Sequence, residues 1–106
     1  MGTLSYSTML SVDFDDWVLS HLQVVIGAKL RRGESFYFSW KGEDSIDGGR
    51  TTIWLHPTVP LVYKYSVAAM PMLNREWLET LSVSANSAAG LQIVPEPATV
   101  GAVSGK

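Results

Sequence analysis

The sequence lacks several features that would assign it to common protein classes. It contains no cysteine, which excludes disulfides and thiolate metal sites. No apolar run approaches the roughly 20 residues that a membrane-spanning helix needs. The N-terminus shows no basic-then-apolar signal pattern, and Tyr6 stands where a myristoylation motif requires Ser or Thr. We therefore expect a cytoplasmic protein without a membrane partner.

Charge is also scarce. Charged residues make up 17% of the chain, the formal net charge is -2 and the pI is about 5.5. Such a balance gives no overall attraction to nucleic acids or anionic membranes, so any DNA contact requires a local basic patch. Hydrophobic residues reach 46% over 106 residues, which suits one folded domain. We predict a single domain over residues 1–97 and a tail of small residues over 98–106.

Catalytic motifs are missing or incomplete. There is no P-loop, no G-x-G-x-x-G and no G-x-S-x-G. The run Asp47-Gly48-Gly49-Arg50 matches half of the K-x-D-G-x-R motif of covalent nucleotidyl transferases, but Ser45 occupies the lysine position. Adenylation needs that amine as the nucleophile, and Lys41 lies further upstream. Asp-Gly is typical of a turn, so we predict a non-enzymatic protein with no catalytic residue and no cofactor. An enzyme that forms an AMP adduct on Lys41 or another lysine is the alternative.

Acidic residues form two groups that could supply oxygen ligands to Mg²⁺. The first group surrounds the start of a predicted helix, where carboxylates complement the helix dipole. The second lies in a polar loop. The two histidines are too far apart in sequence to form an i, i+4 pair. These simpler roles lead us to predict no metal site among the following residues: Asp13, Asp15, Asp16, Glu43, Asp44, Asp47, His21 and His56.

Hydrophobic periodicity predicts the order β-β-α-β-β-β-α-β. Alternating residues indicate strands, and apolar residues at helical spacing indicate a helix over residues 16–32 and a second helix after Asn74. Asp15 or Asp16 and Asn74 are suitable N-caps, while Gly33 and Gly90 mark helix ends. The expected fold is α+β, with two helices packed on one face of a mainly antiparallel five- or six-stranded sheet. The expected strands lie near 4–6, 10–14, 35–41, 50–56, 61–67 and 91–94.

The uncovered face of such a sheet would carry aromatic side chains. Tyr37, Trp54, His56 and Tyr63 are the candidates for a protein-interaction face. This pattern predicts an interaction module that binds a protein partner or associates with itself. One variant is a subunit of a larger, phage-like particle, in which residues 98–106 would order against a neighbour.

Basic residues offer an alternative. Lys29, Arg31 and Arg32 end the first predicted helix, and Arg50 could join them if the fold brings it near. Together with an exposed aromatic they would bind the backbone and bases of DNA. The same cations also complement the dipole at the helix C-terminus.

Three segments carry a resemblance to a known family: "VVIGAKLRRGESFYFSW", "GGRTTIWLHPTVPL" and "LNREWLETLSVSANSAAGLQIVPEP". From about Trp17 to Pro97 the chain resembles a family of small actinobacterial proteins of unknown function, which are often labelled "ATP-dependent DNA ligase". The resemblance implies an accessory role in ligation or repair and supplies no catalytic residue. The matching positions include Arg31, Arg32, Trp40, Arg50, Trp54, His56, Asn74, Arg75 and Trp77.

Overall fold

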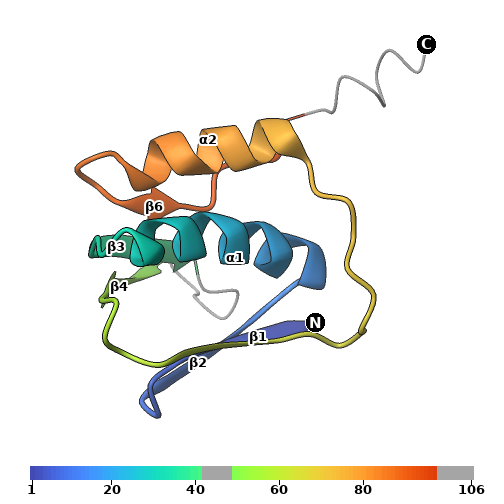
Figure 1. The fold of residues 1–106 in the computed structure, drawn as a ribbon, viewed down its shortest axis with the longest axis horizontal. Helices are drawn as coiled ribbons and strands as arrows, with labels where there is room; N and C mark the ends of the chain where they lie inside the picture. The colour runs from blue at the N-terminus through green and yellow to red at the C-terminus, as the bar shows by residue number, and fades with distance from the viewer. Residues whose placement is uncertain (42–48, 98–106) are drawn as a thin grey trace. The chain divides into compact units, whose positions relative to one another are not determined.

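The computed structural model describes residues 1–41 and 49–97, and its elements confirm the predicted α+β class and order (Figure 1). The predicted N-caps and Gly33 lie within two residues of the observed helix bounds, whereas the second helix ends at Ala85, five residues before the predicted stop at Gly90. In chain order the elements are β1 (Gly2–Tyr6), β2 (Leu10–Phe14), α1 (Asp16–Arg31), β3 (Phe36–Lys41), β4 (Arg50–Leu55), β5 (Leu61–Lys64), α2 (Arg75–Ala85) and β6 (Leu91–Gln92).

The strands form two three-stranded sheets, and the expectation of one sheet with five or six strands is corrected. The strand orders are β2-β1-β5 and β4-β3-β6. Strand β5 pairs antiparallel with β1, with Thr3 opposite Lys64. It therefore does not continue the sheet that contains β4, although it follows β4 in the chain. Pro57 and Pro60 lie between β4 and β5. Because proline cannot donate to a ladder, the chain leaves one sheet there and joins the other.

The chain divides into two compact units, each with one sheet and one helix. The first unit comprises Met1–Ser35 and Leu55–Leu73, and the second comprises Phe36–Trp54 and Asn74–Lys106. Helix α1 therefore belongs with β2-β1-β5, and α2 belongs with β4-β3-β6. The sequence pattern predicted two helices on one sheet, whereas each helix belongs to the unit of a different sheet. The expected tail over residues 98–106 lies outside the described residues.

The first unit begins with a hairpin and continues into α1. Strands β1 and β2 pair from Gly2 opposite Phe14 to Tyr6 opposite Leu10, and Ser7 turns the chain with φ of 59°. The carboxylate of Asp15 accepts the backbone N–H of Trp17 at 2.9 Å and caps the helix. Helical spacing predicts an apolar stripe of Val18, Leu19, Leu22, Val25, Ile26 and Leu30. Leu19, Leu22, Val25 and Ile26 are buried, whereas Val18 and Leu30 at its two ends are only partly buried.

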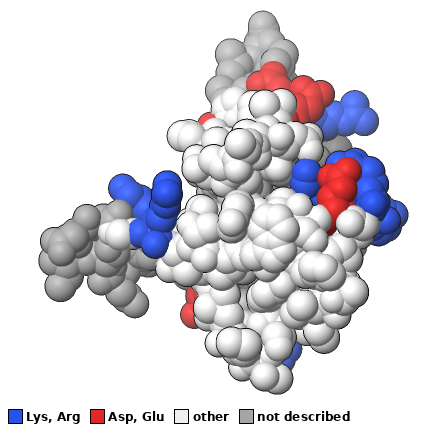
Figure 2. Space-filling view, turned by 90° about the vertical axis from the view of Figure 1, so that its left-hand side faces the viewer, with Lys and Arg blue, Asp and Glu red and all other residues white. Residues whose placement is uncertain are grey.

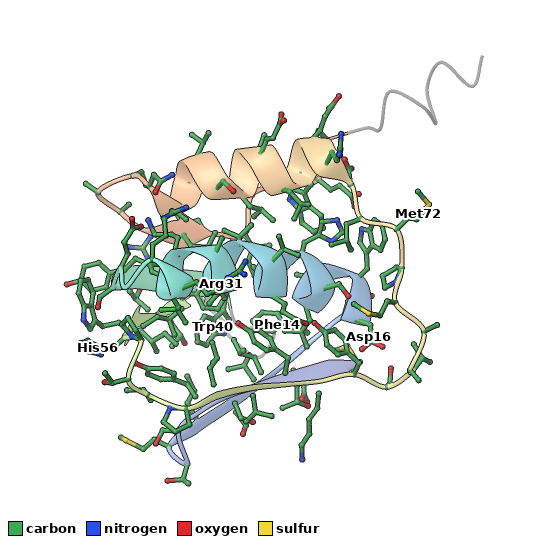
Figure 3. All side chains as sticks on the ribbon, viewed as in Figure 1. Phe14, Asp16, Arg31, Trp40, His56 and Met72 are labelled. Atoms are coloured by element: carbon green, nitrogen blue, oxygen red, sulfur yellow. The ribbon has the colours of Figure 1, made fainter. Side chains whose placement is uncertain are left out.

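Asp16 joins the start of α1 to the segment after β5. Its carboxylate accepts the hydroxyl of Ser66 at 2.7 Å and the backbone N–H of Ser66 at 3.1 Å. Figure 3 shows Asp16 at the beginning of α1, close to this segment. The Ser66 hydroxyl holds the pKa of Asp16 below its ordinary value, and this effect outweighs the partial burial that opposes it.

Replacing Ser66 by alanine is expected to raise the pKa of Asp16. Because the pKa of Asp16 is lower in the folded than in the unfolded chain, its ionised form stabilises the fold above the unfolded pKa. That contribution is lost as the pH falls through the folded pKa. The variant should therefore lose less stability than the parent on acidification, as measured by urea unfolding and by NMR titration of the Asp16 carboxyl. Ser5→Ala removes only a hydroxyl bonded to Ser11 and serves as the control.

The second unit is built around β3, which lies between β4 and β6. The apolar residues Phe36, Phe38 and Trp40 of β3 are buried, together with Trp77, Leu81 and Ala85 of α2, and Ser39 of β3 is also buried. Helix α2 contacts β3 and β6 and covers one face of this sheet (Figure 1). Side chains of β3 alternate between faces, so Tyr37, Ser39 and Lys41 lie on the opposite face.

Candidate functional site

Two aromatic rings stand together on this opposite face of the second unit. Tyr37 of β3 and Trp54 of β4 have ring centroids 4.8 Å apart and an interplanar angle of 69°, which is an edge-to-face arrangement. Tyr37 is 47% exposed and Trp54 is 49% exposed. The prediction that these two aromatics remain at the surface is confirmed. The packing of the two rings against each other fixes both in place.

The neighbouring residues continue this pairing along the two strands. Ser39 and Thr52 join their hydroxyl groups at 2.8 Å. Tyr37 contacts Trp54 and Ser39 contacts Thr52, so residue numbers rise along β3 while those of their partners on β4 fall. The two strands therefore run antiparallel, and the same register places Lys41 opposite Arg50. On the other side of β3, Gln92 of β6 is the register partner of Ser39. We call this surface the open sheet face: Tyr37, Ser39, Lys41, Arg50, Thr52, Trp54 and Gln92.

A hollow lies at the end of this sheet that holds Lys41 and Arg50, and it is lined by residues of both faces, because Trp40 belongs to the buried face. The hollow has a volume of about 530 Å³ and is lined by Ser39, Trp40, Lys41, Arg50, Gln92 and Ile93. It thus offers an ammonium, a guanidinium, a hydroxyl and an amide. These groups can bind a carboxylate or a phosphate through charge-assisted hydrogen bonds. Along β4 the open sheet face changes from an aromatic surface at Trp54 to a cationic one at Arg50. The two positions are about 13 Å apart, at about 3.3 Å of strand per residue.

The other two residues of the predicted interaction face lie in the first unit. The backbone N–H of His56 donates to the Tyr6 hydroxyl at 3.1 Å, and the His56 ring lies 2.8 Å from the Thr58 hydroxyl. Figure 3 labels His56 in the segment between β4 and β5. Tyr63 is half-buried and lines a hollow with Arg31 beside α1, and burial raises its pKa. Within the second unit, Tyr37 and Trp54 are brought together.

Two residues of the predicted basic cluster form ion pairs with the same acidic residue, Glu34. Lys29 is buried to 8% exposure, and its ammonium lies 3.0 Å from the Glu34 carboxylate. Arg32 binds the other oxygen of Glu34 at 3.1 Å. These contacts, first from Arg32 and then from Lys29, lower the pKa of Glu34. Figure 2 shows acidic and basic side chains side by side and a mostly uncharged remaining face. Arg31 is exposed, and Arg50 belongs to the second unit.

The acidic residues of the first group each have a structural partner. Asp13 accepts the Thr3 hydroxyl at 2.9 Å, and the caps and contacts of Asp15 and Asp16 are given above. Within residues 1–41 and 49–97, no group of His, Asp or Glu is placed to hold a metal ion. The second group, Glu43, Asp44 and Asp47, and also Ser45, lie outside the described residues, as does the Asp47-Gly48 turn. Neither described helix is long and apolar enough to span a bilayer.

Exposed methionines are a feature that the sequence analysis did not use. Met1, Met9, Met70 and Met72 are all exposed, and Met72 reaches 92%. Figure 3 shows Met72 pointing away from the chain. The segment from Val67 to Leu73 lines a small hollow of about 110 Å³ with Tyr65 and residues of α1. The sequence contains an indication of this exposed apolar segment, because Met70-Pro71-Met72 lies in a run without charged residues. The prediction for this run was only a connector.

Comparison with known proteins returns one family. Residues 1–96 match the family described as Domain of unknown function (DUF7882). No curated protein and no solved structure matches the chain. The matched range contains every described residue of the open sheet face.

Proposed function

Because the chain belongs to the DUF7882 family, whose description assigns no activity, we propose a function from its geometry. The protein is a non-enzymatic interaction module that binds another protein through the open sheet face. The observation that carries this proposal is the half-exposed, mutually packed Tyr37–Trp54 pair. Tyrosine and tryptophan dominate the few residues that supply most of the energy in protein interfaces.

The surroundings of the pair support a binding role. A rigid aromatic loses little conformational freedom on binding, and here each ring is already held by the other. The exposed Thr52 hydroxyl and the Gln92 amide beside them can supply hydrogen bonds at the rim of an interface. The open sheet face contains no histidine or carboxylate that could act as a general base. It thus favours recognition over catalysis.

A nucleic-acid accessory role, linked to ligation as the family resemblance implies, is the second candidate. The specific observation in its favour is that Lys41 and Arg50 lie in register on the same face as Trp54. Aromatic stacking next to cations is the usual arrangement for binding single strands. The net charge of -2 opposes this candidate, because a polyanion is repelled by the chain as a whole.

A photo-crosslinker at position 37 distinguishes these candidates. Benzoylphenylalanine replaces Tyr37 in one variant and Val83 in a control, since Val83 is 72% exposed on α2 of the same unit. We expect a discrete protein adduct from position 37 and none from position 83. Adding Trp54→Ala should reduce the adduct strongly, because loss of a central aromatic costs about 2 kcal/mol of binding.

The alternatives give different results in the same experiment. An adduct that nuclease removes would favour the nucleic-acid role, and one with twice the mass of the chain would identify a second copy as the partner. Equal crosslinking from positions 37 and 83 would contradict the open sheet face as the interface.

A further inference from the structure

The open sheet face ends at β4, which is an edge strand of its sheet. In the order β4-β3-β6, β4 pairs with β3, and within residues 1–41 and 49–97 no strand pairs with its outer side. Alternate residues of β4 direct their N–H and C=O groups toward that side. Most of β4 is accessible, since Arg50, Thr51, Thr52 and Trp54 are exposed. An exposed edge of 6 residues is as long as an average strand.

The composition of β4 suits pairing with another strand. Threonine, isoleucine and tryptophan favour extended backbone. Natural edge strands are protected by proline, by bulges or by charges in the middle of the strand. Strand β4 has none of these between Thr51 and Trp54, and its single charge is at its first residue, Arg50.

The charge at this end of the sheet indicates the chemistry of the incoming strand. Lys41 and Arg50 are both exposed and line the same hollow. The described residues of β3, β4 and β6 include no acidic side chain. A strand placed beside β4 would therefore meet cations near Arg50 and an aromatic surface near Trp54. A carboxylate at one end and apolar side chains at the other complement that gradient.

We propose that the edge of β4 accepts an extended, acidic peptide segment of a partner protein by strand addition. This inference rests on the proposed function and names the partner's chemistry. Main-chain hydrogen bonds to β4 supply affinity, and the contacts with Arg50 and Trp54 supply specificity. A peptide backbone can accept hydrogen bonds from the N–H groups of the edge and donate hydrogen bonds to its C=O groups. A nucleic acid backbone has no donors that match those C=O groups.

The test measures binding of synthetic peptides to the full chain by calorimetry. The first peptide has the length of β4, 6 residues, with two glutamates at one end, four valines over the rest and both ends capped. The second is identical but methylated at every backbone nitrogen, so that it keeps its charge and cannot enter a ladder. The third carries lysine in place of glutamate. We expect only the first peptide to bind, with new strand signal in the infrared amide band.

A charge reversal supplies a second, independent measurement. Arg50→Glu should weaken the glutamate peptide about tenfold and strengthen the lysine peptide by a similar factor, since an exposed pair changes from attraction to repulsion. Far-ultraviolet circular dichroism checks that the variant is folded. Val83→Ala, on α2 of the same unit, should leave both affinities unchanged.

Several outcomes would overturn strand addition. Equal binding of the methylated peptide would show that the backbone of the ligand is not paired. Tighter binding of oligothymidylate than of the glutamate peptide would assign the face to nucleic acid. A dimer that forms without peptide and excludes it would assign the edge to a second copy. If no peptide binds while the crosslink from position 37 persists, the protein interaction stands and only its strand-addition mode is refuted.

Discussion

Gly90→Ala is expected to destabilise the protein by about 3 kcal/mol or more, which places it among the severe single substitutions. Gly90 has φ of 87°, a conformation that an L residue with a side chain rarely adopts. A Cβ built at this position lies 2.6 Å from the Cβ of Tyr37 and 2.8 Å from its carbonyl carbon. The obstacle is backbone, so rotation of a side chain cannot relieve the overlap.

The consequence extends to the candidate site. Gly90 directly precedes β6, whose Leu91 pairs with Phe38 of β3. An alanine must push the turn away from Tyr37, which disturbs both the parallel pairing and the ring that packs on Trp54. We therefore expect lower stability in urea unfolding together with a changed tryptophan fluorescence of the folded protein.

Gly33→Ala is the matched control for this prediction. Gly33 also has a positive φ, of 75°, but a Cβ there meets nothing within 4 Å. Only the cost of the left-handed backbone remains, about 1 kcal/mol. Equal losses for the two variants would show that the close approach of Gly90 to Tyr37 contributes nothing.

Asn74→Ala is expected to lower the free energy of unfolding by about 2 kcal/mol, because both the oxygen and the nitrogen of the Asn74 side-chain amide form hydrogen bonds. Its oxygen accepts the backbone N–H groups of Glu76 and Trp77 at 3.1 and 3.3 Å and so caps α2. Its nitrogen donates to the Glu96 carboxylate at 2.8 Å and to the Pro97 carbonyl at 3.1 Å. Asn74 is 4% exposed, so water cannot readily replace these partners.

Asn74→Asp separates the two roles. A carboxylate still caps the helix but faces the Glu96 carboxylate where the amide donated before. We expect this variant to be unstable at neutral pH. Two facing carboxylates raise the pKa of the pair above that of the unfolded chain, so the folded state gains a proton as the pH falls. Its stability relative to the parent should recover toward about pH 4, near the ordinary carboxyl pKa. Urea unfolding at both pH values checks this, and a pH-independent deficit would contradict it.

The helices were predictable because their signals are local. Asp15, Asn74 and Gly33 act within one turn of the backbone they terminate, and each occupies the predicted role. The pairing of strands was not predictable in this way. Alternation in "LVYK" shows which side chains share a face but does not name the neighbouring strand. The pairing of β5 with β1 joins residues from opposite parts of the chain.

The candidate site was predictable in part for the same reason. The exposure of Tyr37 and Trp54 follows from alternation within a strand, and their contact follows from a hairpin. Lys41 was considered only as a nucleophile, and its position opposite Arg50 requires the register. Lys29 was expected among the surface cations, but it is buried and paired with Glu34 just beyond the helix end. Charge order along a helix predicts the sign at its end and does not predict which charges are already neutralised.

The interleaving of the two units has a consequence for synthesis on the ribosome. Every residue of the described first unit has left the ribosome once Leu73 emerges, so that unit can fold during translation. Strands β3 and β4 must then wait for α2 and β6, which are made later. During that interval Phe36, Phe38 and Trp40 lack the helix that covers them. Nascent chains held on the ribosome with Leu73 just outside the exit tunnel should therefore engage chaperones through β3 and β4, and release should follow when α2 has emerged.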